Sequence, residues 1–416
     1  MQSINSNINL YYIPMTKLKT TTVGVYIHRP LDKNEVSKNA VLPYVLKRGC
    51  MLCNNSSDVY KYLENLYGAS FASSVLKLGD DQVIYLGFET ISDRFAPCGE
   101  KLVSDIIKLL VSVLFEPVQF THETVEQEKN NAKNRILAEI NDKRRYAMVR
   151  CGEEMCEGDK FALSVLGTID DIDKITAEDL KSHYEKIITS SVIDIYICGE
   201  CDENAVTKEL KESTMKIAFS DSSLPKSQIF TRQGDIKKVT DHMDVVQGKL
   251  SMGFRTNIEA NSSDYITLMV LNSIFGGGAH SKLFNNVREK LSLCYYASSS
   301  LVKHKGIMFV NAGIEFENFD KAYNEILSQL DCIKRGEISE LEYTSSINAL
   351  LNELESYKDD QHMMQLFELG QKLSGVSLGI EEMKDKISKV KIEDVKNVAK
   401  KIELDTVYFL DGKEER

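Results

Sequence analysis

The sequence predicts an α+β protein made of two tandem homologous domains, each an α/β sandwich with a mixed sheet and a helical layer. Three observations predict this fold: an internal repeat with a period close to half the chain, strand-like alternation at the start of each half, and helical periodicity through most of the remainder. With 416 residues, the chain is long enough for each half to bury its own core. We expect the two domains to face one another across a cleft, as half of a clamshell.

The internal repeat is clearest near the end of each half. Ile172–Lys181 matches Ile387–Lys396 at an offset of 215 residues, with Ile, Lys, Glu, Asp and Lys at equivalent positions. Earlier in each half, Val83–Glu89 matches Met308–Glu315 through a shared Gly-apolar-Glu ending. A third, shorter match lies between these two in the same order. A period this long does not fit a solenoid, and it indicates a duplicated domain.

The expected elements follow the same order in both halves. Alternating, strand-like segments open them at Thr22–His28 and at Leu250–Arg255. Helical periodicity then dominates, as in Leu102–Val113. A strand-like run closes each half, at Val192–Cys198 and at Thr406–Leu410. This order is the one expected of a sheet covered by a helical layer.

A loop-like stretch separates the halves. Residues 220–227 read Ser-Asp-Ser-Ser-Leu-Pro-Lys-Ser, a composition typical of a loop. We therefore place a linker at 220–235, after a first domain at 1–219 and before a second domain at 236–416.

The composition excludes several classes of function. The 51 Lys and Arg residues against 62 Asp and Glu give a net charge of −11, which offers no general attraction to nucleic acid or to an anionic membrane. The longest mainly apolar stretch, Ile106–Phe115, is too short to cross a bilayer, and the N-terminal residues lack the pattern of a secretory signal. Nine cysteines, an odd number spread over a long chain, suit reduced thiols. We expect a cytoplasmic protein without nucleic-acid or membrane partners.

The histidines and cysteines give no clear metal site. No two of the seven histidines lie three or four residues apart, so no helix presents the paired imidazoles of a zinc site. Two Cys-x-x-Cys pairs, Cys50/Cys53 and Cys198/Cys201, could together supply four thiolates, but 145 residues separate them. We interpret them as reduced, hydrophobic side chains, with a joint metal site or a redox role as the alternatives.

The segment Phe275–Tyr296 carries the most chemical information. Its three consecutive glycines permit a tight turn, and a helix with an apolar stripe follows them. Arg288 falls on the polar face of this helix, and Tyr295 lies seven residues further on, so both side chains can reach one side of a cleft. The alternative is a surface arginine and a packed tyrosine at a corner between a helix and a strand.

This segment closely resembles the second-domain signature of the insulinase, pitrilysin and mitochondrial processing peptidase family of zinc metallopeptidases. In that signature a glycine-rich turn and a Leu-Phe helix lead to Arg-Glu-Lys and a Leu-Ala-Tyr-like end. The resemblance also covers the opening strands and the Glu-Asp motifs near Glu178 and Glu393, so it spans nearly the whole chain. It implies a catalytic role for Arg288 and Tyr295, which match the family's arginine and tyrosine that bind the substrate backbone and stabilise the tetrahedral intermediate.

The first half departs from the family at the zinc motif. Active members carry His-x-x-Glu-His on a first-domain helix, where two histidines bind zinc and the glutamate activates water. Alignment on the Lys-Arg-Gly sequence at 47–49 puts Ala40, Pro43 and Tyr44 at those positions, and none of these side chains can do that work. Pro43 also indicates that the helix begins later or bends there. We therefore expect no metal and no cofactor in this chain.

The family's third ligand, a downstream glutamate, falls in one of two places. Counting from Glu128 puts it at Arg135, whereas a shifted register puts it at Glu139. The sequence leaves this register open.

The resemblance also implies that substrate adds a strand to an edge of the first-domain sheet, here at 69–76. The family's Asn-Ala at this edge appears as Phe71-Ala72, so the polar contact of the asparagine is lost. Phe71, Ala72 and Ser73 are the candidate substrate-binding residues. The same strand could equally serve an interface.

A chain that has lost the zinc motif and kept Arg288 and Tyr295 resembles the zinc-less subunit of the heterodimeric members of this family. The resemblance implies a homologous partner that holds the zinc, and cleavage of short or unfolded peptides only when the two subunits are together. A homodimer remains open when that partner is absent. The alternative function is that of a catalytically inactive structural or peptide-binding member.

Overall fold

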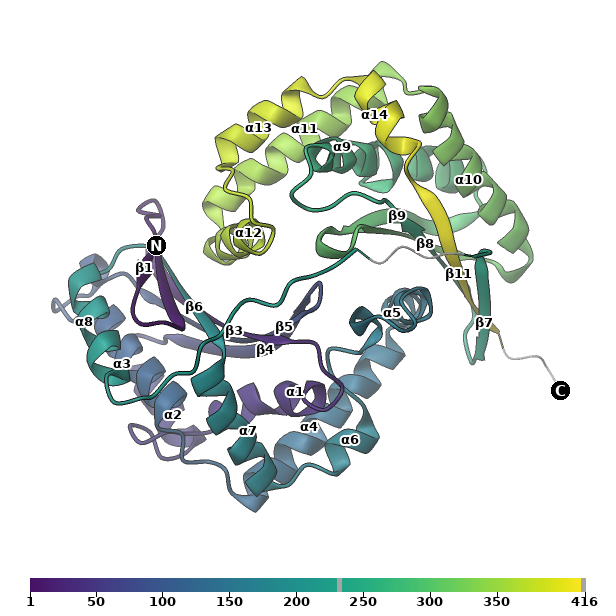
Figure 1. Ribbon diagram of the computed structural model, residues 1–416. Coiled ribbons are helices and arrows are strands. Elements are labelled where there is room, and N and C mark those ends of the chain that lie inside the picture. Colours follow the sequence, from purple (N-terminus) through teal and green to yellow (C-terminus); the bar gives the residue numbers. More distant parts are fainter. Residues whose placement is uncertain (230–233, 413–416) are drawn as a thin grey trace. The chain divides into compact units, whose positions relative to one another are not determined.

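The computed structural model describes residues 1–229 and 234–412. Residues 230–233, within the predicted linker, and 413–416, at the end of the predicted second domain, lie outside the described residues. The chain forms two compact units, and each contains one sheet with helices packed on it (Figure 1). Unit 1 comprises Met1–Leu137, Leu163–Lys226 and Tyr357–Gly370, and unit 2 comprises Ala138–Ala162, Ser227–Ser356 and Gln371–Arg416.

The sheet of unit 1 is mixed, as the sequence predicts. Its strands lie in the order β1-β2-β6-β3-β5-β4. Strands β2 and β6 are parallel, whereas β3 pairs antiparallel with both β5 and β6, and β4 pairs antiparallel with β5. This order makes β4 an edge strand. The strands are β1 (Gln2–Ser3), β2 (Ile8–Ile13), β3 (Thr20–Pro30), β4 (Ser70–Leu78), β5 (Asp81–Ile91) and β6 (Val192–Cys198).

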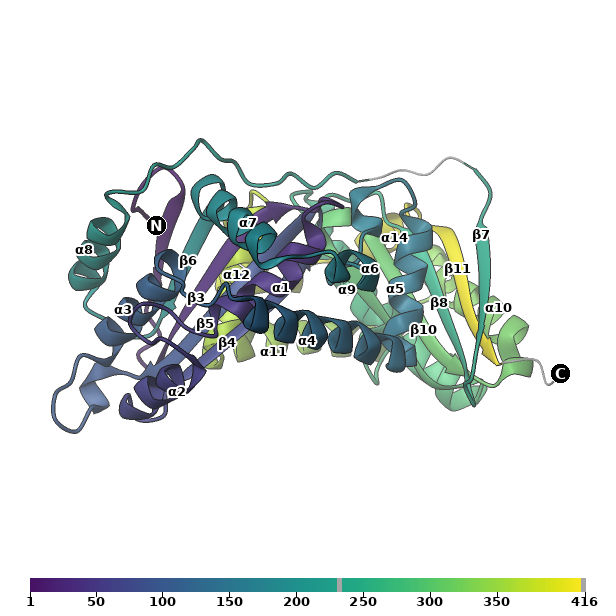
Figure 2. The ribbon, with the colours of Figure 1, turned by 90° about the horizontal axis from the view of Figure 1, so that it is seen from below.

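Helices cover one face of this sheet, and Figure 2 views unit 1 from their side. Their apolar side chains interdigitate with those of the strands, as where Leu42 of α1 and Ile106 of α3 join Ile195 of β6 in one buried core. Helix α3 confirms the helix that the periodicity of 102–113 predicts. The helices are α1 (Val36–Leu46), α2 (Ser56–Asn65), α3 (Leu102–Phe115), α4 (His122–Asn141), α6 (Ile169–Asp173), α7 (Ala177–Ser190) and α8 (Glu203–Thr214).

Unit 2 repeats this plan, which confirms two homologous α/β sandwiches. Its strands lie in the order β7-β11-β8-β10-β9, with β7 and β11 parallel and the other pairs antiparallel. The edge strand β9 thus corresponds to β4 of unit 1. The strands are β7 (Lys237–Met243), β8 (Gly248–Arg255), β9 (Cys294–Val302), β10 (Ile307–Ile314) and β11 (Glu403–Gly412); the helices on one face are α9 (Asp264–Gly276), α10 (Phe319–Arg335), α11 (Glu340–Ser356), α13 (Ile380–Lys389) and α14 (Ile392–Ala399).

Equivalent aspartates cap equivalent helices in the two units. The Asp179 carboxylate accepts a hydrogen bond from the backbone nitrogen of Thr176 at the start of α7, at 3.4 Å. The Asp394 carboxylate accepts one from the backbone nitrogen of Lys391 at the start of α14, at 2.9 Å. The two aspartates are 215 residues apart, the offset found in the sequence repeat. The matching residues therefore do the same structural work, which is to satisfy a free N–H at a helix start.

Helix α5 (Lys143–Met155) comes from the first half of the sequence but packs in unit 2. Cys151 and Met155 of this helix form a buried cluster with Phe309 of β10 and Tyr408 of β11. The helix therefore packs on the face of the unit 2 sheet opposite α9, α10, α11, α13 and α14 (Figure 1).

Helix α12 (Gln361–Leu373) comes from the second half and makes the reciprocal packing in unit 1. The Gln365 side chain donates a hydrogen bond to Thr22 Oγ1 at 2.9 Å and accepts one from the Tyr26 hydroxyl at 3.0 Å. The compact units therefore differ from the two contiguous halves of the chain by these exchanged helices. The boundary at 220–235 remains a prediction of where the two repeats join.

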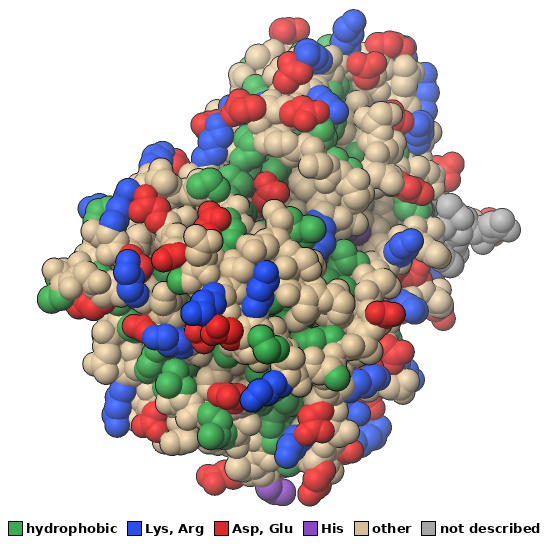
Figure 3. All heavy atoms as spheres, turned by 60° about the vertical axis from the view of Figure 1, so that its left-hand side comes forward, with side chains coloured by type: hydrophobic (Ala, Val, Ile, Leu, Met, Phe, Trp, Pro, Cys, Tyr) green, Lys and Arg blue, Asp and Glu red, His purple; other side chains and the backbone are tan. Residues whose placement is uncertain are grey.

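None of the helices within 1–229 and 234–412 is long and apolar enough to cross a membrane. On the face shown in Figure 3, acidic and basic side chains are interspersed rather than gathered by sign. That face consequently has no broad field of one sign that would attract a polyanion.

Three buried ionisable side chains tie the central strands of unit 1 together. His28 on β3 places Nδ1 2.5 Å from Asp81 Oδ2 and Nε2 3.2 Å from Asp194 Oδ2. All three side chains are at most 1% exposed. Burial lowers the pKa of His28, but the two carboxylates outweigh it and raise that pKa to about 9. The imidazolium is therefore the form that the folded state favours.

This triad predicts a pH dependence of stability. Because the histidine pKa in the unfolded chain is about 6.5, the stabilisation is fully present below about pH 6.5 and is lost as pH rises through about 9. His28→Gln should remove up to about 3 kcal/mol of that pH-dependent free energy. Denaturant unfolding at a series of pH values between about 6.5 and about 9 should show that the free energy of unfolding of this variant depends less on pH than that of the wild-type chain. His122→Gln, at an exposed position, is the control, and an equal slope in both variants would contradict the assignment.

Candidate functional site

The segment that carries Arg288 links a buried helix to the edge strand of unit 2. Helix α9 ends at Gly276, where a Cβ would lie 2.4 Å from the backbone nitrogen of Ser299, so this close approach requires glycine. The next segment, Leu283–Lys290, is a π-helix, a rare form that occurs frequently at functional sites. Its Leu283 and Val287 are buried, as the predicted apolar stripe requires.

Arg288 and Tyr295 both lie at the surface of unit 2. The Arg288 guanidinium carbon lies 4.6 Å from the centroid of the Phe284 ring, which holds the side chain along the π-helix. Tyr295, at the start of β9, is 64% exposed. Its hydroxyl donates a hydrogen bond to Glu315 Oε1 at 2.9 Å, and this carboxylate raises the pKa of Tyr295. Arg288 thus lies on the π-helix and Tyr295 on the strand that follows it, and the Tyr295 hydroxyl is hydrogen-bonded to Glu315.

Helix α1 holds the positions that align with the zinc motif. It runs unbroken from Val36 to Leu46 through Pro43, so the expectation of a later start is wrong. Proline in a helix interior costs about 3 kcal/mol, and here the helix keeps it because it is packed inside unit 1. Ala40 and Pro43 are buried, whereas Tyr44 borders a pocket.

Arg135 of α4 lies directly on Tyr44. Its guanidinium carbon is 3.5 Å from the centroid of the tyrosine ring, a stacked cation–π contact. Glu139, the other candidate for the third ligand position, instead pairs with Arg145 at 2.7 Å. The geometry therefore selects Arg135 as the counterpart of the family's third ligand.

This set of side chains does not fit zinc. Alanine and proline offer no ligand atom, tyrosine is a poor ligand at neutral pH, and a guanidinium that stays protonated repels a cation. Among the described residues, no group of three or more His, Cys, Asp or Glu is placed to hold a metal ion elsewhere.

A pocket of about 580 Å³ opens beside the stack, between α1, α2, α4 and the start of β4. Lys47 Nζ lies 5.5 Å from the centroid of the Phe71 ring within it. Arg48 forms a two-nitrogen ion pair with the buried Glu128, with Nε 2.6 Å from Oε1. In the sequence, Lys47 and Arg48 only fix the alignment with the family's zinc motif, and no role is predicted for them. Two adjacent basic residues one helical turn after a lost metal motif were the signal that could have revealed this pocket.

The candidate substrate residues begin the edge strand β4. The Phe71 side chain is only 6% exposed and stacks on Phe88 with ring centroids 4.2 Å apart. Ala72 is exposed and Ser73 is half-buried. Phe71 therefore forms part of the pocket wall, and the role of these three residues in substrate binding stays a prediction.

Six of the nine cysteines are buried, and Cys98 is exposed. All nine are free thiols. Cys50 and Cys53 form a turn closed by hydrogen bonds between their own backbones, at 2.8 and 3.1 Å. Burial raises the pKa of Cys198 to about 12, so this thiol stays protonated at neutral pH.

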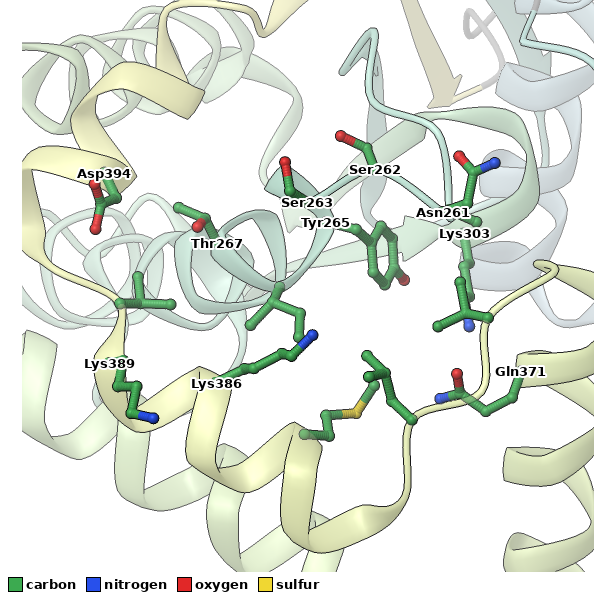
Figure 4. Close-up of a pocket in the computed structure, with 16 residues that line it drawn as sticks. Asn261, Ser262, Ser263, Tyr265, Thr267, Lys303, Gln371, Lys386, Lys389 and Asp394 are labelled. Atoms are coloured by element: carbon green, nitrogen blue, oxygen red, sulfur yellow. The ribbon is translucent and has the colours of Figure 1, made fainter.

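A second cavity, of about 410 Å³, lies within unit 2 (Figure 4). Tyr265, Lys303, Lys386 and Gln371 are directed toward it from four different segments of the chain. The Lys303 ammonium lies 5.6 Å from the centroid of the Tyr265 ring, and burial lowers the pKa of Lys303 to about 8. None of the positions that resemble the family's functional motifs lies here.

The lowered pKa of Lys303 predicts selective reactivity. At pH 8 about half of this amine is unprotonated, against less than about 1% for a lysine with the ordinary pKa of about 10.4. Brief labelling with an acylating reagent at pH 8, read by peptide mass spectrometry, should modify Lys303 several-fold faster than the exposed Lys216. Equal rates would contradict the prediction, because they would show that burial limits the access of the reagent enough to cancel the effect of the larger unprotonated fraction.

Comparison with known proteins identifies the family. Residues 174–350 match the family described as the peptidase M16 inactive domain. Over 422 aligned residues, the chain is 35% identical to "Probable inactive metalloprotease YmfF" of Bacillus subtilis (strain 168), with all of this chain and 98% of that protein covered. The chain belongs to the M16 peptidase family. The resemblance inferred from the Gly-rich segment and the duplicated fold is thereby confirmed.

Two further relatives extend this comparison. A crystal structure of a conserved protein from Enterococcus faecalis V583 superposes with a TM-score of 0.89 at 28% identity, covering 98% of this chain and 97% of that one. "Uncharacterized zinc protease YmxG" of Bacillus subtilis (strain 168) is 22% identical over 57% of this chain and 58% of its own length. The relatives of this chain thus include one protein named as a probable inactive metalloprotease and one named as an uncharacterized zinc protease.

The side chains at the zinc-motif positions predict a chain that binds no zinc tightly. Protein purified without a metal-affinity tag should contain far less than one zinc per chain by inductively coupled plasma mass spectrometry. A zinc-bearing M16 relative purified in the same way is the control. One tightly bound zinc per chain would defeat the prediction.

Proposed function

We propose that this M16 chain is the non-zinc-binding subunit of a heterodimeric metallopeptidase that degrades or processes short or unfolded peptides. The observation that carries the proposal is the combination of two features in one chain. Arg288 and Tyr295 are retained at the surface of unit 2, whereas the Arg135–Tyr44 stack takes the place of a zinc site in unit 1. In this proposal the zinc belongs to a homologous partner subunit, and this chain is inactive alone.

In the assembled enzyme, the activation of water would come from the partner's zinc. Arg288 would hold the substrate backbone through its guanidinium donors, and the Tyr295 hydroxyl would donate to the developing oxyanion. Tyr295 must first leave Glu315, a step that its 64% exposure permits without any opening of the core.

The relatives support a pair of this kind. Bacillus subtilis has an M16 protein named as probably inactive, which this chain matches over its full length, and another named as a zinc protease. Two chains of complementary chemistry are what a shared catalytic centre requires. We place the pairing in the cytoplasm, where free thiols such as the nine of this chain stay reduced.

The second candidate is an inactive structural or peptide-binding subunit. The Tyr295–Glu315 hydrogen bond favours it, because a phenol held by a carboxylate has its donor engaged. On this alternative the Arg288–Tyr295 pair stabilises the corner between the π-helix and β9 and contributes nothing to turnover.

Substitutions of Arg288 and Tyr295 distinguish the catalytic function from the structural one. In the complex with a zinc-bearing M16 partner, Arg288→Ala and Tyr295→Phe should each lower kcat on a quenched flexible peptide by about 100-fold or more, because one preorganised donor is lost. Co-elution of the two subunits should not change. An unaffected rate in both variants would refute the catalytic role and favour the structural one.

Two matched variants control for surface effects. Tyr67→Phe removes another exposed tyrosine hydroxyl that donates to a carboxylate, that of Glu100, and Arg335→Ala removes another exposed arginine paired with a glutamate. Both should leave turnover unchanged.

A further inference from the structure

The pocket beside the Arg135–Tyr44 stack is charged in a way that packing alone does not explain. Arg135 Nε and Nη2 are covered by neighbouring atoms and have no hydrogen-bond partner among the described residues. A buried donor without an acceptor is costly, and more so on a charged group. The Tyr44 ring therefore holds one face of the guanidinium, whereas the Nε and Nη2 donors lack hydrogen-bond acceptors in the part of the chain that the structure describes.

Lys47 adds a second positive charge to the same pocket. Within the described part of the chain, no carboxylate lies at ion-pair distance from its ammonium, which instead faces the Phe71 ring. The burial of Lys47 lowers its pKa, and the adjacent Arg48 lowers it further. An anion in the pocket would relieve this cost as well.

The carboxylates of the pocket do not cancel these charges. Glu128 is taken by Arg48 and also accepts a hydrogen bond from Asn131 at 3.2 Å. Glu64 is exposed at the rim. With Arg48 and Glu128 paired, Lys47 and Arg135 leave an excess of positive charge against the single rim glutamate.

The position of the pocket indicates what kind of anion fits. The residues that begin the edge strand β4, Ala69 to Phe71, form one of its walls, and Tyr60 and Leu63 of α2 supply apolar surface. An extended peptide that pairs antiparallel with β4 has its C-terminus beside the first residue of that strand. Its carboxylate would then meet the pocket where the two cations lie.

We propose that this pocket binds a carboxylate of an extended peptide paired along β4, with Arg135 and Lys47 as the anion-binding residues. A charge-assisted hydrogen bond to a carboxylate is stronger than a neutral one, whether it comes from the Lys47 ammonium or from the Arg135 guanidinium. The position that lost its zinc ligands thus recognises one end of a peptide instead of cutting it. The C-terminal carboxylate and an acidic side chain near that terminus are the two sources of this group. The inference concerns binding by this chain alone and does not depend on the catalytic role of Arg288 and Tyr295.

Fluorescence anisotropy with the full chain alone tests the proposal. The probe is an N-terminally labelled, unstructured peptide of about ten residues, rich in Val and Thr, without acidic side chains. The form with a free C-terminal carboxylate should bind about tenfold tighter than its C-terminal amide. A third peptide, amidated but with Asp as its last residue, identifies the source: restored affinity assigns the site to carboxylates in general, and weak binding assigns it to the chain terminus.

Variants locate the preference in the pocket. Arg135→Gln and Lys47→Gln should each reduce the ratio between acid and amide peptides toward one, whereas Lys61→Gln, an exposed lysine on α2, should leave it unchanged. Higher salt should weaken the acid peptide more than the amide in the wild-type chain. If Arg135→Gln does not fold, as judged by circular dichroism, the Lys47→Gln and salt measurements decide.

Three results would overturn the proposal. These are equal affinity of the wild-type chain for the acid and amide peptides, no binding of either, and an unchanged preference in a folded pocket variant. Since none of these experiments measures cleavage, their failure leaves the proposed peptidase role to be judged by the Arg288 and Tyr295 variants.

Discussion

The contact between Arg135 and Tyr44 places a permanent positive charge where the family's zinc motif would lie. A metal cation and a guanidinium cannot share that position, because the nearest groups would repel the metal and supply no ligand. The departure of this chain from the family's zinc motif is therefore not a matter of one missing histidine. It results from a rebuilt contact between α1 and α4, in which the arginine is held by an aromatic face and the helix retains Pro43 in its interior.

The chemistry that remains is divided between the units. Unit 2 presents the half-buried Arg288 from a π-helix and the exposed Tyr295 from an edge strand, and both side chains are donors. Unit 1 presents a pocket with two cations beside the corresponding edge strand. Donors and cations suit the binding of carbonyl oxygens and carboxylates. Among the described residues, no group of three or more His, Cys, Asp or Glu is placed to hold a metal ion that would activate water. This division fits the proposal that this M16 chain binds peptides and relies on another chain to cut them.

Much of the fold could be read from the sequence because the duplication leaves periodic and local signals. The matches at Ile172–Lys181 and Ile387–Lys396 correspond to equivalent helix starts, and the capping aspartates within them explain why these positions stayed alike. The exchange of α5 and α12 could not be read in this way. An amphipathic helix shows that it has an apolar face, but not which sheet that face will cover, and this depends on contacts far apart in sequence, such as Gln365 with Tyr26.

In the candidate site, too, the residues within one local segment could be predicted, whereas contacts between distant segments could not. Arg288 and Tyr295 were found because they sit in one contiguous, unusual segment. The choice between Arg135 and Glu139 at the third-ligand position was left open because the spacing along the chain allowed two registers. Lys47 was missed because a lysine at the end of a helix most often lies in solvent, and only the fold shows that it faces the Phe71 ring.

The most direct test of the central claim is a titration. This chain would be added to a fixed amount of a zinc-bearing M16 relative from the same genome, with cleavage of a quenched flexible peptide as the readout. The account predicts no cleavage by either protein alone, a rise that saturates at an equimolar ratio, and complete loss with a chelator. A relative that is fully active by itself and is unchanged by addition of this chain would contradict it.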